Sequence, residues 1–135
     1  MPKPISYQKT FCVSADVIDH FNHVNNLVYV KWVLDISKEH WNSFSPEAVR
    51  NEFGWMILKH ELHYKGQAKL NDELLIETWI KDFSTARSHR KTIIKDRKTD
   101  KIILESLAEW CFVSLNTRKP TRLSTEILHP YFEDL

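Results

Sequence analysis

The chain has 135 residues, enough for one domain with a buried core, and we expect a single domain over residues 1–135. Hydrophobic residues make up 42% of it and charged residues 27%, which predicts a soluble globular protein and argues against disorder. The net charge is only +1, from 19 basic and 18 acidic residues, so the basic excess typical of a nucleic-acid-binding protein is missing.

The first predicted elements are a strand and a helix, joined by a polar segment. Residues 5–15 have the pattern of a strand with Phe11 and Val13 on one face. We expect a helix over residues 24–42, because polar side chains recur there at helical spacing and form one narrow stripe, made of Lys31, Asp35, Lys38 and Asn42. The rest of this helix is largely apolar, so other elements must enclose it.

A shorter helix and a change of period come next. Ser45 and Pro46 are typical of an N-cap and a first helical position, and this helix should end near Phe53. After Gly54 the sequence alternates with a period of two, which predicts a strand. One face of that strand should carry Met56, Leu58, His60, Leu62 and Tyr64.

Three further strands are predicted over residues 74–83, 88–96 and 101–116, followed by a basic tail with a short helix. The order is therefore one strand, one long apolar helix and four antiparallel strands. This order predicts an α+β domain in which one curved sheet wraps around one helix.

Several common features are missing from the sequence. Its only two glycines, Gly54 and Gly66, exclude the phosphate-binding loops of P-loop and Rossmann proteins. Residues 1–10 contain no apolar signal-peptide core, and the longest apolar run, residues 24–36, is too short to span a membrane. Cys12 and Cys111 need not form a disulfide in a domain of this size, so we expect a reduced, cytoplasmic protein.

The densest polar cluster lies between the first strand and the long helix. It runs from Asp19 to Asn26 and includes His23 and Asn25. Backbone N–H groups at a helix N-terminus are unpaired and carry partial positive charge. Such amides can hold the oxyanion that forms at a thioester carbonyl, while a nearby carboxylate attacks the carbonyl carbon or deprotonates a water. The cluster is therefore a candidate acyl-transfer site.

Two other interpretations of this cluster stay open. Asp and Asn residues before a helix are ordinary N-caps, and His23 can bond a nearby backbone group. A metal site formed by Asp19, His20 and His23 is a further alternative, but the spacing matches no standard zinc pattern and no distant fourth ligand is evident. We expect no metal and no bound cofactor.

The same segment resembles the signature of the hot-dog-fold thioesterases. The likeness is to the 4-hydroxybenzoyl-CoA thioesterase-like group and, more closely, to the plant and bacterial acyl-ACP thioesterases. The latter carry an Asp, a His four residues later, Val-Asn-Asn and then a Tyr. The matching residues here are Asp19, His23, Val24, Asn25, Asn26 and Tyr29. The predicted strand order also fits this fold, so the likeness covers nearly the whole chain.

This resemblance implies an acyl-CoA or acyl-ACP thioesterase of the hot-dog fold. In that case Asp19 is the catalytic carboxylate, as nucleophile or general base, and His23 and Asn22 support its geometry. The acyl chain would lie in an apolar channel beside the helix. The amides that polarise the thioester carbonyl would be those of Val24, Asn25 and Asn26.

The sequence also departs from the family pattern. The acyl-ACP enzymes have an Asn where this chain has Phe21, and many relatives have a Gly where it has Asn22. They commonly contain two hot-dog repeats, so one repeat implies a homodimer joined at the sheet edges, or a tetramer of two such dimers. A non-catalytic acyl-thioester-binding module and a hot-dog enoyl-thioester hydratase or dehydratase remain alternatives.

Two basic clusters are candidates for contact with the phosphates of coenzyme A or with the acidic surface of an acyl carrier protein. The alternative is a solvated turn and a solvated tail. The first cluster consists of Arg87, His89, Arg90 and Lys91, and the second of Arg118, Lys119 and Arg122.

Overall fold

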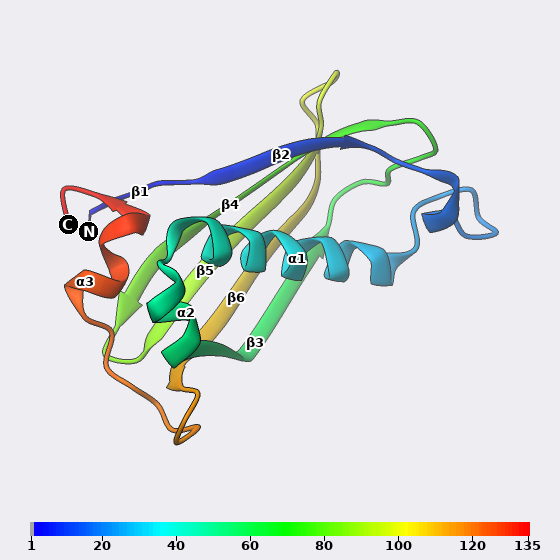
Figure 1. The fold of residues 1–135 in the computed structure, drawn as a ribbon. Coiled ribbons are helices and arrows are strands. Elements are labelled where there is room, and N and C mark those ends of the chain that lie inside the picture. Colours follow the sequence, from blue (N-terminus) through cyan, green and yellow to red (C-terminus); the bar gives the residue numbers. More distant parts are fainter. Residues whose placement is uncertain (1) are drawn as a thin grey trace.

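The computed structural model describes residues 2–135, and it contains one five-stranded antiparallel sheet with a long helix across one face (Figure 1). The strand order in the sheet is β2-β4-β5-β6-β3. These strands are β2 (Tyr7–Cys12), β3 (Phe53–Tyr64), β4 (Glu73–Ser84), β5 (Arg87–Asp96) and β6 (Ile102–Ser114). The helices are α1 (Asn26–Phe44), α2 (Glu47–Glu52) and α3 (Thr125–Leu128). The prediction of an α+β hot-dog domain is thus confirmed.

Short elements close the two ends of the fold. The strands β1 (Lys3–Pro4) and β7 (Phe132–Glu133) pair with each other, so the N-terminal and C-terminal segments lie side by side. Two 3-10 turns are present, η1 (Ala15–Val17) and η2 (His129–Tyr131). No helix in the described range 2–135 is long and apolar enough to cross a membrane.

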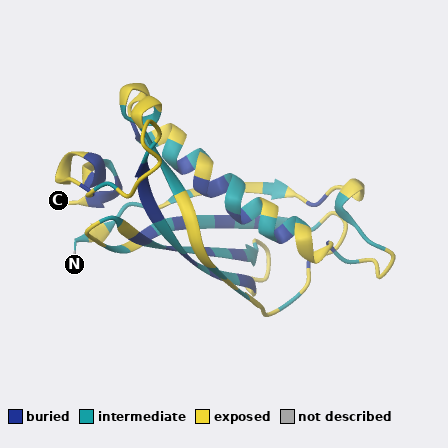
Figure 2. Ribbon diagram, turned by 90° about the horizontal axis from the view of Figure 1, so that it is seen from below, coloured by how far each residue is buried: buried dark blue, intermediate teal, exposed yellow. Residues whose placement is uncertain are grey.

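The helix α1 is buried along one stripe only. The stripe faces the sheet and consists of Tyr29, Val33, Ile36, Ser37 and His40 (Figure 2). The predicted polar stripe faces outward, with Lys31, Lys38 and Asn42 exposed. The expectation that other elements enclose this helix is therefore wrong for the isolated chain, because a single sheet covers a single face and Leu27 is left 76% exposed.

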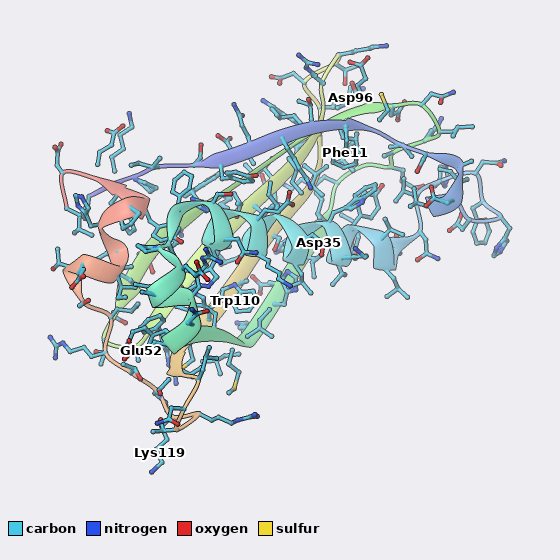
Figure 3. The ribbon with its side chains drawn as sticks, viewed as in Figure 1. Phe11, Asp35, Glu52, Asp96, Trp110 and Lys119 are labelled. Atoms are coloured by element: carbon cyan, nitrogen blue, oxygen red, sulfur yellow. The ribbon has the colours of Figure 1, made fainter. Side chains whose placement is uncertain are left out.

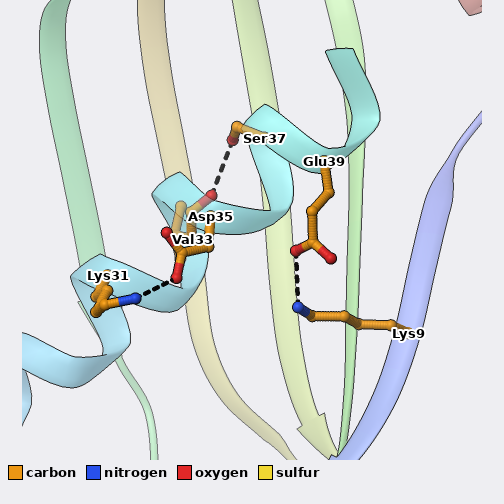
Figure 4. A network of polar contacts seen from close by, with 6 residues as sticks. All are labelled: Lys9, Lys31, Val33, Asp35, Ser37 and Glu39. Atoms are coloured by element: carbon orange, nitrogen blue, oxygen red, sulfur yellow. Dashed lines mark hydrogen bonds and ion pairs between the residues drawn. The ribbon is translucent and has the colours of Figure 1, made fainter. Parts of the chain in front are cut away.

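Polar contacts hold α1 in place on the sheet. The Lys9 ammonium group on β2 bonds Glu39 at 2.7 Å and ties the edge strand to the helix (Figure 4). Within the helix, the Ser37 hydroxyl donates to the Val33 carbonyl at 2.9 Å, so this buried hydroxyl is satisfied by the helix itself.

The helix boundaries differ slightly from those predicted. The helix α1 begins at Asn26 and not at residue 24, because the Asn25 side chain is the N-cap and accepts from the Leu27 amide at 2.9 Å. Pro46, and not Ser45, occupies the N-cap position of α2. The buried Ser45 hydroxyl instead bonds the Tyr131 hydroxyl at 2.6 Å, a partner 86 positions away in the sequence.

A bulge in β3 overturns the predicted alternation of that strand. The pairing with β6 slips between Ile57 and Lys59, which leaves Leu58 as an extra residue. After the bulge, Leu62 points toward the core. Before the bulge, the residues that point toward the core are Phe53 and Trp55. Met56 therefore does not share a face with Leu62, and Met56 and Leu58 are both about half exposed, at 49% and 45%.

Candidate functional site

The predicted polar cluster forms a tight loop immediately before α1. An isolated bridge pairs Ile18 with Val24, and the Asp19 amide donates to the His23 carbonyl at 2.9 Å. Asn22 takes a positive φ of 63°, and its amide donates to the Asp19 carbonyl. Glycine and asparagine tolerate this conformation best, which explains physically why either residue suits this position.

The loop and the first turn of α1 enclose one open depression of about 380 Å³. Asp19 and His23 line it together with the three residues Val24, Asn25 and Asn26. Phe21 and Gln67 complete the lining, whereas Asn22 lies outside it. The structure therefore brings together five of the six residues predicted for catalysis and carbonyl positioning, and it adds Gln67, which the sequence did not indicate.

Asp19 is held by the loop but keeps one oxygen available. Its Oδ1 accepts from the Phe21 amide at 2.9 Å, and Oδ2 has no hydrogen-bond partner within residues 2–135. The His23 ring likewise makes no hydrogen bond within the described range. A partly exposed carboxylate with a free oxygen can attack a carbonyl carbon or accept a proton from water.

The expectation of three free amides at the helix N-terminus is wrong for two of them. The Val24 amide donates to the Ala68 carbonyl at 3.0 Å, and the Asn25 amide donates to the Val17 carbonyl at 3.0 Å. The Asn26 amide, the first of α1, has no acceptor in the described part of the chain. Asn26 is therefore the member of this set that can still donate to an oxyanion.

Tyr29, the last residue of the sequence signature, has a structural position. It is 1% exposed, and its hydroxyl accepts from the amide of the fully buried Ala68 at 2.9 Å. Burial raises the pKa of Tyr29 above its usual value. Since the Ala68 carbonyl also accepts from Val24, Ala68 connects the helix interior to the loop that carries Asp19.

The first basic cluster does not exist as one surface. Residues alternate along β5, so Arg87 and Lys91 lie on the outer face of the sheet, where Arg87 pairs with Glu109 at 2.9 Å. Arg90 lies on the inner face, is only 7% exposed, and donates to His40 of α1. The prediction that Arg90 belongs to an exposed phosphate-binding surface is therefore wrong.

The second basic cluster lies far from Asp19 within the chain. Arg118 and Lys119 are exposed in the turn after β6, and Figure 3 places Lys119 at the end of the molecule near α2. The loop with Asp19 lies at the opposite end of α1. A helix of 19 residues is about 28 Å long, so this turn cannot contact a group bound beside Asp19 of the same chain unless that group is very extended.

A second cavity, of about 240 Å³, lies beside the C-terminal half of α1. Trp41, Trp55 and Trp110 line it, together with Arg90 and Lys38. The sequence predicted an apolar channel beside the helix, but two basic side chains make this cavity only partly apolar. Among the described residues, no three His, Cys, Asp or Glu side chains come together in a group that could hold a metal ion.

Comparisons with known proteins agree with this fold. A family model of the acyl-ACP thioesterase N-terminal domain matches residues 4–131. The chain therefore belongs to the acyl-ACP thioesterase family, and its fold is that of the hot-dog thioesterases. No curated protein sequence matches it significantly.

Solved structures with the same fold are distant in sequence. A 1,4-dihydroxy-2-naphthoyl-CoA thioesterase from Synechocystis is 14% identical, with a TM-score of 0.79 over 93% of this chain and 94% of that one. A Staphylococcus aureus protein in complex with CoA is 16% identical, with a TM-score of 0.82 over 95% and 82%. The 12:0-ACP thioesterase from Umbellularia californica is 15% identical, with a TM-score of 0.81 over 96% of this chain but only 51% of its own.

Proposed function

We propose that this chain hydrolyses an acyl thioester, an acyl-CoA or an acyl-ACP, to a carboxylic acid and a free thiol. The observation that supports this most directly is the depression at the N-terminus of α1. It gathers the Asp19 carboxylate, the His23 ring and the unpaired Asn26 amide beside one open space. These groups are the ones that acyl transfer requires.

The proposed reaction uses Asp19 in one of two ways. As a general base, it takes a proton from water, and the hydroxide oxygen attacks the thioester carbonyl carbon. As a nucleophile, its free oxygen attacks that carbon directly, and water then hydrolyses the resulting anhydride. In both cases the carbonyl oxygen becomes an oxyanion that accepts from the Asn26 amide, and the C–S bond breaks to release the thiolate.

We also propose that the working form is a homodimer, or a tetramer of two such dimers. The strand β3 is 12 residues long and has no neighbour on its outer edge within the described sheet. It exposes Met56, Ile57 and Leu58, at 49%, 38% and 45%. A long apolar strand edge of this kind pairs readily with another copy, and pairing would also extend the cover over α1.

The test measures thiol release from short, long and aromatic acyl-CoA substrates and from acyl-ACP. Asp19→Asn should lower kcat by roughly 10²–10⁴-fold with an unchanged melting temperature, because the amide can neither attack nor accept the proton. Asp16→Asn is the matched control, because Asp16 is an exposed acid on the same segment but outside the depression. Equal turnover by wild type and Asp19→Asn would remove Asp19 from its role.

Labelled water separates the two mechanisms. In a single turnover in ¹⁸O-water, label in the Asp19 carboxylate shows a nucleophilic Asp19 whose anhydride is attacked by water at the Asp19 carbon. A general base places the label in the released acid only, and trapping of the anhydride with hydroxylamine separates this case from attack of water at the acyl carbon of the anhydride. Tight binding of acyl-CoA or acyl-ACP without release of thiol would instead support the acyl-thioester-binding alternative. Hydration of crotonyl-CoA would support the hydratase alternative.

A further inference from the structure

The cavity beside α1 is distinct from the depression that contains Asp19. It lies between the C-terminal half of the helix and the inner face of the sheet, with Trp55 of β3, Arg90 of β5 and Trp110 of β6 on the sheet side. Figure 3 shows Trp110 beneath this part of the helix. Ser37 lies eleven positions after Asn26, which corresponds to about 16 Å along the helix axis, a span that a long acyl chain can cover.

The most unusual group in this cavity is a buried cation without a counter-ion. Arg90 is 7% exposed, and its Nη1 donates to Nδ1 of His40 at 2.9 Å and to Oγ1 of Thr78 at 3.1 Å. A guanidinium has five N–H donors, so three are left without an acceptor in the described chain. Arg90 makes no ion pair with any carboxylate of residues 2–135.

The two side chains that accept from Arg90, His40 and Thr78, do not supply a negative charge. The Thr78 hydroxyl is neutral. Burial lowers the pKa of His40 to about 3, so the ring is neutral at pH 7 and accepts from Arg90. Burial also lowers the pKa of Arg90, but only to about 10, so the guanidinium remains charged. A charge with little access to solvent and no counter-ion is unfavourable, so an anion that enters the cavity gains by pairing with Arg90.

A second donor without an acceptor adjoins the same space. The indole N–H of Trp110 is buried and has no hydrogen-bond partner in residues 2–135. Lys38 adds a second positive charge to the lining, and no acidic side chain contributes to it. The cavity therefore offers hydrogen-bond donors, positive charge and flat aromatic walls, a combination that suits an anionic oxygen on an apolar body.

We propose that the acyl group accepted by this protein carries a second, anionic oxygen group at its distal end, and that Arg90 and Trp110 bind it. The group is a carboxylate at the end of a long aliphatic chain, because such a chain can cover the distance from the Asn26 amide to this cavity and carries a full negative charge at pH 7. A plain alkyl chain fits less well, because its methylene groups would further desolvate Arg90 without pairing its charge. This assignment rests on the proposed thioesterase function for the reaction, but the anion site itself does not require turnover.

The binding experiment uses octanoate and 1-octanol, which share an apolar chain but differ in charge. Binding is followed by the fluorescence of the tryptophans in the cavity. Wild type should bind octanoate at least tenfold more tightly, and Arg90→Met should abolish this preference. Lys91→Met is the control, because it removes the same charge from the adjacent residue on the outer face of β5.

The turnover experiment compares tetradecanedioyl-CoA, whose distal carboxylate lies far enough from the thioester to reach this cavity, with myristoyl-CoA. The diacid thioester should show a kcat/KM at least tenfold above that of myristoyl-CoA in wild type, and Arg90→Met should invert the order. If Arg90→Met does not fold, Arg90→Lys and Trp110→Phe replace it, because the first keeps the charge and the second removes only the indole donor from an aromatic side chain.

The outcomes separate this inference from the proposed function. Equal binding of octanoate and 1-octanol by wild type, or a preference that survives Arg90→Met, overturns the anion site even if myristoyl-CoA is hydrolysed efficiently. A preference that depends on Arg90, with no hydrolysis of any thioester, upholds the anion site and overturns the thioesterase proposal. An equal loss on charged and neutral substrates in Arg90→Met shows a merely structural role and also overturns the inference.

Discussion

The substitution Tyr29→Phe tests the connection between the core and the Asp19 loop. The Tyr29 hydroxyl accepts from the Ala68 amide at 2.9 Å, and both residues are buried, at 1% and 0% exposure. Phenylalanine keeps the aromatic ring and therefore its edge-on packing against Trp32 at 5.5 Å. The change thus removes a single acceptor and leaves one buried N–H group unpaired.

The expected cost follows from that unpaired amide. A buried donor that loses its partner costs about 1–3 kcal/mol. For a chain of this length, about 2 kcal/mol lowers the melting temperature by on the order of 5–10 °C. Hydrogen exchange at the Ala68 amide should accelerate in the same variant, because its acceptor is gone.

Tyr64→Phe provides the matched comparison. The Tyr64 hydroxyl donates to the Asn26 carbonyl at a long 3.4 Å, and the residue is 46% exposed. Its removal should change the free energy of unfolding by less than about 0.5 kcal/mol. Thermal unfolding of both variants decides the matter, and equal stability of Tyr29→Phe and Tyr64→Phe would refute the structural role assigned to Tyr29.

Two further predictions concern pH and assembly. Burial and Arg90 hold the pKa of His40 at about 3, below its value of about 6.5 in the unfolded chain. Neutral His40 therefore contributes fully to stability above pH 6.5. This contribution is lost as the pH falls toward 3, by up to about 1.4 kcal/mol per pH unit. In NMR titrations the His40 ring should therefore stay neutral from pH 8 to 5, and a midpoint near 6.5 in the folded protein would contradict this. Leu58→Asp on the β3 edge should convert the homodimer to a monomer in light scattering, whereas Leu70→Asp, which alters an equally exposed leucine away from that edge, should leave the mass unchanged. A monomeric wild type, or a Leu58→Asp variant of unchanged mass, would remove β3 as the dimer contact.

The secondary structure could be predicted because its signals are local. The polar stripe of α1 recurs with the helical period, and β4 alternates between half-buried and buried residues from Glu73 to Ile80. The α+β arrangement followed from the order of these elements, one strand, one long helix and four strands, although the helix is covered by the sheet on one face only and is not enclosed as expected. The segment from Asp19 to Asn26 was also found from the sequence, because its residues are neighbours in the chain.

The errors concern contacts between segments that are distant in the sequence. Val24 donates to Ala68 and not to a substrate, and nothing near Val24 in the sequence indicates that acceptor. The bulge at Leu58 depends on how β3 meets β6, so the alternation of β3 alone could not reveal it.

The position of Arg90 could be predicted from the sequence only in part. The period of a strand already places Arg90 and Lys91 on opposite faces, but it cannot say which face meets the helix. The sequence by itself determined the elements, their order and the Asp19 segment, because periodicity, capping and local motifs involve neighbouring residues. Only the tertiary structure decided which amides remain free, which face of β5 is inward and where a cation is buried without a partner, because those depend on register and packing between distant parts of the chain.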